Sequence, residues 1–251
     1  MTDLTGKHAL VTGGGTGIGL AIARDFEARG AVVTITGRRQ EVLDEVAGPA
    51  MTGVAMDVRD EAQVNDVITA AAEARGPIQI CVANAGIAEG RTVPKTSLEF
   101  WRNMMATNLD GAFLTIKASL PSMQSTDWGR VIGISSMAGL KGLPGAAAYS
   151  ASKHGLIGLI RTLSEDYMGQ PYTFNALCPA YVDTPIISRN EEMIAQRSGK
   201  TAEEARQVMV RMNRHKRLIE PEEIAATARW LTAAGSESVN GQCIEIAGGQ
   251  M

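Results

Sequence analysis

The sequence predicts an α/β fold: a doubly wound, seven-stranded parallel sheet with helices on both faces. Two observations carry this prediction. Short apolar stretches typical of buried strands alternate with helical patterns along almost the whole chain. The length of 251 residues suits one domain of this kind, and a content of 45% hydrophobic and 20% charged residues is enough to bury a sizeable core.

The alternation assigns each stretch of the chain to a strand or a helix. The expected strands are 8–12, 31–36, 51–58, 78–86, 129–136, 172–179 and 242–249. The expected helices are 17–30, 41–47, 61–76, about 97–124, about 148–168 and 221–234. Gly30 ends the first helix, and Pro221 suits the start of the last because its missing N–H would have no partner there. Right-handed crossovers between successive strands then give the doubly wound topology.

Residues 185–217 interrupt the alternation. This charged segment has a helical pattern and lies between the sixth strand and the following helix. A segment that follows the C-terminal end of a strand can cover a crevice at that edge of the sheet. We therefore expect a single nucleotide-binding domain over residues 1–251, with 185–217 inserted in it as a helical substrate lid.

Composition and charge argue against several classes of partner. The formal net charge is -3 and basic residues form no long run, so a nucleic acid is not expected. No apolar stretch approaches the roughly 20 residues of a membrane span, and the N-terminus shows no signal-peptide pattern. Cys81, Cys178 and Cys243 lie far apart in apolar runs, as expected for buried free thiols of a cytoplasmic protein. The histidines have no metal-ligand spacing, so no metal is expected.

The stretch "VTGGGTGIG" (11–19) follows the first strand and opens the first helix. Glycines there let the backbone approach a pyrophosphate, and the free N–H groups of a helix start favour an anion. The spacing is Gly-x-x-x-Gly-x-Gly rather than the strict dinucleotide pattern, and a tight turn without a ligand is the alternative. The context predicts nucleotide binding by five residues: Gly13, Thr16, Gly17, Ile18 and Gly19.

The residues after the second strand bear on the choice of nucleotide. Arg38 and Arg39 stand where an acidic residue would accept the ribose hydroxyls. Guanidinium groups suit a 2′-phosphate, so NADP(H) is favoured, NAD(H) stays possible, and a solvated arginine pair is the alternative. Asp57 would accept a hydrogen bond from the adenine amino group. The other cofactor contacts expected at strand ends are Val58, Asn84, Ala85 and Gly86.

The stretch "GAAAYSASKHG" (145–155) places Tyr149 and Lys153 four residues apart, on one face of the expected helix. A cation beside a phenol favours the phenolate and is expected to lower the pKa of Tyr149. A solvated pair without a function is the alternative. Ser136 lies thirteen residues before Tyr149, at the end of the expected fifth strand.

With these residues the chain resembles the short-chain dehydrogenase/reductase family, in its single-domain branch, from about residue 4 to the C-terminus. The motifs "TGGGTGIG", "NAG", "ISS" and "YSASK" occur in the family's order and spacing. The resemblance implies a Rossmann-type fold and hydride transfer between an alcohol or ketone and a nicotinamide cofactor. It implies dimers or tetramers formed through helices 102–124 and 148–168.

The resemblance also implies roles for individual residues. Asn108, Ser136, Tyr149 and Lys153 match the family's catalytic tetrad, and Tyr149 and Lys153 would also contact the cofactor. Tyr149 would exchange a proton with the substrate oxygen while Ser136 donates a hydrogen bond to it. Asn108 would hold a water that links Lys153 to solvent; a helix-interrupting asparagine bonded to its own backbone is the alternative. The nicotinamide-side positions are Pro179, Val182 and Thr184.

The substrate is less defined by the sequence. Besides Ser136 and Tyr149, the expected contacts are Met137, Ala138, Leu143, Tyr181, Ile186 and, on the lid, Met193. Hydroxybutyrate dehydrogenases of the family fix a carboxylate with polar groups where this chain has Ala88, Ala138 and Ala146, so a neutral ketone or secondary alcohol is favoured. An acyl thioester of CoA or of a carrier protein is the alternative because the lid is rich in basic residues. A non-catalytic nucleotide sensor is disfavoured, since all four tetrad residues are present.

Overall fold

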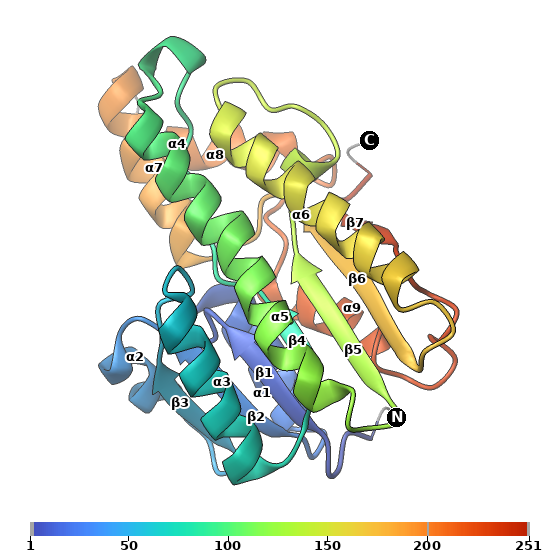
Figure 1. The fold of residues 1–251 in the computed structure, drawn as a ribbon. Coiled ribbons are helices and arrows are strands. Elements are labelled where there is room, and N and C mark those ends of the chain that lie inside the picture. Colours follow the sequence, from blue (N-terminus) through green and yellow to red (C-terminus); the bar gives the residue numbers. More distant parts are fainter. Residues whose placement is uncertain (1–2, 200, 250–251) are drawn as a thin grey trace.

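Seven parallel strands form the centre of the molecule in the computed structural model, which describes residues 3–199 and 201–249, without the side chains of residues 190 and 193–198. The strands are β1 (His8–Thr12), β2 (Val32–Gly37), β3 (Met51–Ala55), β4 (Ile78–Ala83), β5 (Gly129–Ile134), β6 (Tyr172–Pro179) and β7 (Cys243–Ile246). They form one sheet in the order β3-β2-β1-β4-β5-β6-β7 (Figure 1). The predicted seven-stranded, doubly wound Rossmann-type sheet is confirmed.

Helices cover both faces of this sheet. They are α1 (Gly17–Glu27), α2 (Gln40–Val46), α3 (Glu61–Arg75), α4 (Leu98–Met105), α5 (Gly111–Met123), α6 (Ala147–Asp166), α7 (Pro185–Ser198), α8 (Ala202–Met212) and α9 (Pro221–Trp230). Helices α3, α5 and α6 lie on one face, and α1 and α9 pack together on the other (Figure 1). Short helical turns are η1 (Val93–Lys95), η2 (Ala106–Asp110) and η3 (Met137–Gly139).

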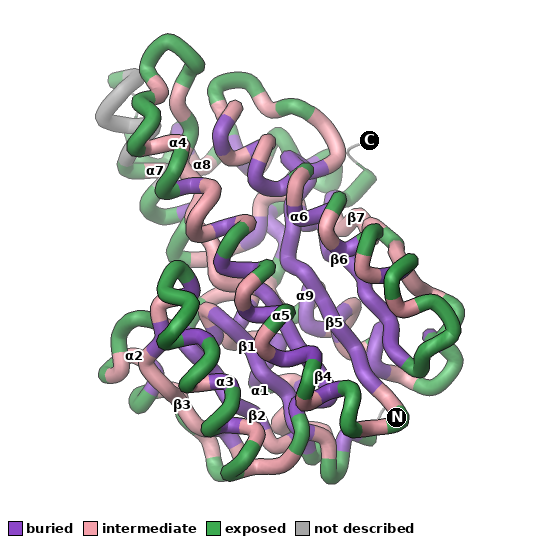
Figure 2. The backbone as a smooth tube through the Cα atoms, viewed as in Figure 1, coloured by how far each residue is buried: buried purple, intermediate pink, exposed green. Residues whose placement is uncertain are grey.

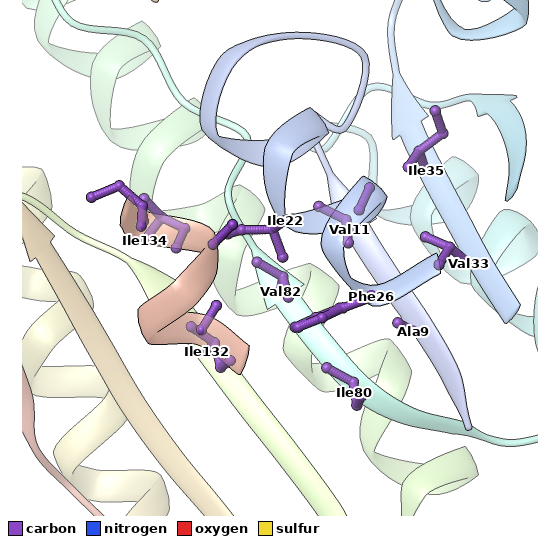
Figure 3. Close-up of a cluster of buried hydrophobic side chains, with 14 of the residues drawn as sticks. Ala9, Val11, Ile22, Phe26, Val33, Ile35, Ile80, Val82, Ile132 and Ile134 are labelled. Atoms are coloured by element: carbon purple, nitrogen blue, oxygen red, sulfur yellow. The ribbon is translucent and has the colours of Figure 1, made fainter. Parts of the chain in front are cut away.

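The largest apolar cluster lies between the sheet and α1 and α9. Strands contribute β-branched side chains such as Val33 and Ile35, and α1 contributes Ile22 and Phe26, all fully buried (Figure 3). A second cluster lies on the opposite face, between β4–β6 and helices α5 and α6. Burial on both faces explains why the inner strands are mostly apolar in sequence, whereas the edge strands β3 and β7 are largely half-buried (Figure 2).

Several predicted strands end earlier than expected. The strands predicted at 51–58, 78–86, 129–136 and 242–249 end at residues 55, 83, 134 and 246. After β4, for example, the backbone N–H groups of Asn84 and Ala85 both donate at 3.1 Å to the side-chain hydroxyl of Thr12, the last residue of the neighbouring strand β1. At β4 the regular strand therefore ends where backbone N–H groups turn to a side-chain acceptor.

The helix predicted at about 97–124 is interrupted. Between α4 and α5, the turn η2 is a π-helix that contains Asn108. Such single π turns are frequent at functional sites. Within the described ranges, no helix is long and apolar enough to cross a membrane.

Candidate active site

The sequence-predicted residues gather at the carboxyl ends of the strands. There the chain leaves β1 toward β2 on one side of the sheet and returns through β4 on the other. This reversal opens the crevice in which doubly wound sheets bind their ligands. The turn after β1, the ends of β4 and β5 and the start of α6 all reach this edge (Figure 1).

The glycine-rich turn after β1 leaves no room for side chains. Gly13 and Gly17 have φ values of 64° and 53°, which disfavour other residues. A Cβ at Gly19 would lie 2.5 Å from both Asn84 Nδ2 and the Gly13 carbonyl oxygen. Asn84 itself donates to the carbonyl oxygens of Thr12 and Gly13, at 2.8 and 3.2 Å. The side chain of Asn84 thus joins the end of β4 to this turn.

The start of α1 fits an anionic ligand. Thr16 is the N-cap residue, yet it makes no side-chain cap hydrogen bond, and the first turn of the helix has no acidic residue. Thr16 is exposed, whereas Ile18 packs against the main apolar cluster. The backbone N–H groups at this helix start, together with its partial positive charge, suit the phosphates of a dinucleotide.

The ends of β2 and β3 lie beside this turn. Arg38 and Arg39 are exposed after β2, and Arg38 lies close enough to Asp57 to favour its ionised form. A hydrogen-bonded ion pair with Arg59, at 2.6 Å, is the main cause that lowers the pKa of Asp57. Val58 differs from its neighbours, because its side chain is buried in the cluster beneath α3 and only its backbone remains for a ligand.

Tyr149, Ser136 and Lys153 are brought together by α6 and the end of β5. Ser136 is hydrogen-bonded to Tyr149, and its hydroxyl also accepts the Ala138 N–H at 3.1 Å. The Lys153 Nζ lies 5.9 Å from the centroid of the Tyr149 ring. It donates to the Ile134 carbonyl at 2.8 Å, and the lysine is only 5% exposed. These contacts place the three side chains around one point beyond β5.

The pKa of Tyr149 is shifted in the opposite direction from our expectation. We predicted that Lys153 lowers the pKa of the phenol, but burial raises it, and the hydrogen bond with Ser136 only opposes this effect. The reason is that the phenolate loses its hydration while the Lys153 ammonium is directed to the Ile134 carbonyl. Burial also lowers the pKa of Lys153 to about 8, so this group titrates close to neutrality.

Asn108 is fixed by partners distant in sequence, not by its own backbone. Its Oδ1 accepts the Ile87 N–H at 2.8 Å, and its Nδ2 donates to the Ile87 carbonyl at 2.9 Å and to Ser152 Oγ at 3.1 Å. Ser152 in turn donates to the Tyr149 carbonyl at 2.8 Å. A Cβ at Gly86 would lie 3.2 Å from Asn108 Oδ1 and 3.6 Å from Lys153 Nζ. Asn108 therefore ties the loop after β4 to the helix of Tyr149.

Sequence reasoning missed several of these partners. It did not identify Thr12 or Ser152 as partners. It also missed Cys178, at the end of β6, whose thiol is hydrogen-bonded to the Ser135 side chain and the Ser136 backbone. Cys178 and Cys81 are buried free thiols, as predicted, whereas Cys243 is only half-buried. The one available signal was the position of Ser152 directly before Lys153 in "YSASK".

The nicotinamide-side residues follow β6. Pro179 is its last residue, and Val182 is buried and pairs with Ile219. Thr184 faces the glycine-rich turn, since a Cβ at Gly17 would lie 3.1 Å from its Cγ2. The segment after β6 therefore contacts the proposed phosphate end of the crevice.

The residues predicted to face the substrate differ in how far they are buried. Met137 and Ala138 are buried in η3, and Ala88, Leu143, Ala146 and Tyr181 are half-buried. Ile186 is 40% exposed at the start of α7. The side chain of Met193 lies outside the described residues.

Arg206 links helices α7 and α8 to the segment that follows β6. Arg206 on α8 bonds Asp183 at 2.6 Å and Glu191 on α7 at 2.9 Å. Ile187, Met209 and Leu218 form a small apolar cluster beneath these helices. The α7–α8 segment thus packs beside the carboxyl edge of the sheet.

Comparison with known proteins defines the class. The family model described as short chain dehydrogenase matches residues 7–195. The chain is 32% identical to a D-beta-hydroxybutyrate dehydrogenase of Rhizobium meliloti (strain 1021), over 97% of this chain and 98% of the relative. It is also 32% identical to a 3-oxoacyl-(acyl-carrier-protein) reductase of Mycobacterium bovis, over 97% of this chain and 92% of the relative.

A solved structure supports membership of the same family. The crystal structure of a variant actinorhodin polyketide ketoreductase with NADPH matches with a TM-score of 0.93 and 32% identity, over 97% of each chain. The protein therefore belongs to the short-chain dehydrogenase family, as the sequence motifs predicted. It is an oxidoreductase that acts on alcohol and ketone groups.

Proposed function

We propose that the protein interconverts a neutral ketone and the corresponding secondary alcohol with NADP(H), and that Tyr149 is the general acid and base. The observation that carries this proposal is the convergence of Tyr149, Ser136 and Lys153 beyond β5, beside a glycine-rich turn that has no room for side chains. Asn108 completes the set by positioning the loop after β4 against α6.

The bound nicotinamide supplies the hydride that the carbonyl carbon accepts. Tyr149 gives its proton to the carbonyl oxygen, and Ser136 donates a hydrogen bond that stabilises the negative charge developing there. Because burial raises the pKa of Tyr149, the phenol carries its proton at neutral pH, as a proton donor must. Lys153, with a pKa near 8, exchanges protons readily and can restore the proton of Tyr149.

The cofactor is NADP(H) in this proposal, with NAD(H) as the alternative. Arg38 and Arg39 are exposed where the adenosine ribose would lie, and NADPH is present in the ketoreductase structure that this fold matches. Replacing Arg38 by alanine is expected to weaken NADPH binding about tenfold, because one charge-assisted hydrogen bond to phosphate is lost, and to leave NADH binding nearly unchanged. Fluorescence titration with both nucleotides measures this, and equal losses would contradict the assignment.

A neutral substrate is supported by Ala88, Ala138 and Ala146, which offer no partner to a carboxylate. The names of the acyl-carrier-protein reductase and the polyketide ketoreductase favour a 3-oxoacyl thioester as the second candidate. On the α7–α8 segment, however, Arg206 and Arg217 are paired with acidic residues rather than free for phosphates. We propose that this segment, residues 185–217 of the single domain, is the substrate lid.

A panel of ketones with NADH and NADPH in parallel tests the proposal. Turnover of neutral ketones supports it, and a gain in kcat/KM of a 3-oxoacyl-CoA over a free ketone of equal bulk would favour the thioester. If no carbonyl compound on the panel is turned over while nucleotide still binds, the protein is a nucleotide sensor and the proposal fails.

We also propose that the protein is a cytoplasmic homodimer or homotetramer. The outer faces of α5 and α6 support this, because they enclose a shallow hollow of about 270 Å³ lined mostly by apolar side chains. Phe113, on this face, is 46% exposed. Exposed apolar patches of this kind are typical of surfaces that other protein chains cover.

A further inference from the structure

A second tyrosine lies close to the reacting centre. Tyr181 follows β6 by two residues, and its phenol is near enough to that of Tyr149 for the two to interact electrostatically. Its ring is half-buried and packs against the apolar cluster of Ile187, Met209 and Leu218. The ring of Tyr181 thus packs against the α7–α8 segment while its hydroxyl lies near that of Tyr149.

The backbone of Tyr181 is fixed on both sides. The Asn213 Nδ2 donates to the Tyr181 carbonyl at 2.9 Å, and its Oδ1 accepts the Tyr181 N–H at 3.3 Å. The Ile219 N–H also donates to this carbonyl at 2.9 Å. Asn213 is fully buried at the end of α8. These bonds of the buried Asn213 amide fix the backbone from which the Tyr181 side chain projects.

The hydroxyl of Tyr181 has no hydrogen-bond partner among the described residues. Tyr172, by contrast, donates its hydroxyl to the Thr126 carbonyl at 2.9 Å. Burial raises the pKa of Tyr181, so its phenol remains a neutral donor at physiological pH. A half-buried phenol whose hydroxyl has no partner in the chain is available to donate to a ligand.

We infer that the Tyr181 hydroxyl donates a hydrogen bond to a second, uncharged oxygen of the substrate. This inference rests on the proposed function and narrows it: the substrate is an oxygenated ketone, such as a diketone, a hydroxyketone or a 3-oxo ester, rather than a simple ketone. Apart from the tetrad residues Ser136 and Tyr149, Tyr181 is the only polar side chain at the predicted substrate-facing positions, so it is the group there that recognises a second oxygen. A carboxylate is disfavoured, because one neutral donor does not replace its hydration.

The test is a set of matched substrates on matched variants. The kcat/KM values of 2,3-pentanedione and ethyl acetoacetate are compared with that of 2-pentanone, for the wild type, Tyr181→Phe and Tyr172→Phe. Tyr181→Phe keeps the ring and removes the hydroxyl. It is expected to lower kcat/KM about tenfold for at least one of the two dioxygenated substrates, as the loss of one hydrogen bond does, and to leave 2-pentanone almost unaffected.

The control Tyr172→Phe is expected to leave the ratio between the substrates unchanged, since its hydroxyl contacts the Thr126 carbonyl instead. If Tyr181→Phe lowers all three values equally, or none of them, the inference is wrong while the proposed function stands. If the wild type reduces none of the three substrates or any other ketone, the proposed function fails and the inference fails with it.

Discussion

The carboxyl edge of the sheet has two halves that are held in place differently. On the side of β1, β4 and β5, side chains such as Asn84 and Asn108 bond directly to backbone atoms of neighbouring segments. On the side of β6, one buried side chain, Asn213, makes such bonds at the end of α8, and the rest of helices α7 and α8 is held by the ion pairs of Arg206, whose side chain is 31% exposed, and by a small apolar cluster.

This difference suggests different roles for the two halves, one in the reaction and the other in substrate selection. A polar side chain bonded to backbone inside the fold has one satisfactory geometry, and breaking it leaves a buried group without a partner. Exposed ion pairs contribute only about 0–1 kcal/mol and tolerate rearrangement. We therefore expect the reaction to depend on the first half, and the identity of the substrate to depend mainly on the second.

The largest expected effect comes from adding a side chain to the glycine-rich turn, in the half of the edge formed by β1, β4 and β5. A Cβ introduced by Gly19→Ala would lie 2.5 Å from Asn84 Nδ2 and from the Gly13 carbonyl oxygen, so the turn must shift. Dinucleotide affinity is expected to fall by roughly a hundredfold, because a displacement of about 1 Å is enough to lose a positioned contact. Fluorescence titration with NADPH measures the affinity.

The matched control is Gly158→Ala on α6, where a Cβ meets nothing within 4 Å. It should leave affinity unchanged and raise the free energy of unfolding by about 0.5–1 kcal/mol, as alanine does in a helix. Unchanged NADPH binding in Gly19→Ala would show that the turn is not a nucleotide site.

A smaller effect is expected in the second half. Arg206→Met removes two ion pairs but keeps the apolar stem of the side chain. Because these pairs hold the proposed lid, KM for the ketone should rise about threefold to tenfold, with kcat little changed and a stability loss below about 1 kcal/mol. Steady-state kinetics and urea unfolding measure these quantities.

Arg229→Met is the control for this variant. Arg229 is equally exposed, at 31%, and its ion pair with Asp25 joins α9 to α1 away from the site. The KM of Arg229→Met for the ketone should match that of the wild type. A drop in kcat in Arg206→Met without a change in KM would mean that the α7–α8 segment belongs to the chemistry, against the comparison drawn above.

The smallest effect concerns the pH dependence of stability. His8 is buried on β1, with Nδ1 2.8 Å from the Gly76 carbonyl and Nε2 2.9 Å from the Thr34 hydroxyl, and burial lowers its pKa below 6.5. The unfolded chain then binds a proton that the folded chain excludes. Stability from this group is therefore complete above pH 6.5 and declines as the pH falls toward the lowered pKa.

Urea unfolding above and below pH 6.5 measures this dependence in the wild type and in His8→Gln. The variant should lose less stability on acidification. His154→Gln is the control, because this ring is exposed and, among the described residues, bonds the Ser150 carbonyl of its own helix. This variant should keep the slope of the wild type. Equal slopes in all three proteins would exclude His8 as the cause.

The parts that could be predicted from sequence are those set by local pattern. The apolar strands follow from burial on both faces, and the pairing of Tyr149 with Lys153 needs only the spacing of one helix. The glycine-rich turn was recognisable because its conformation, with positive φ at Gly13 and Gly17, limits the residues allowed there.

The parts that could not be predicted depend on contacts between distant residues. The π turn at 106–110 coincides with the bonds of Asn108 to Ile87, which lies 21 residues away. The raised pKa of Tyr149 results from burial by several segments, which the Tyr149–Lys153 spacing alone does not reveal. The role of Asn213 was missed for the same reason, since it is separated by 32 residues from Tyr181.

The most direct test of the central claim is Tyr149→Phe, assayed on the neutral ketone that the wild type reduces fastest. If Tyr149 is the proton donor, turnover should fall by about a thousandfold or more, while NADPH binding, measured by titration of the same sample, stays close to that of the wild type. Near wild-type turnover in this variant would contradict the assignment of Tyr149 as the acid and base of the reaction.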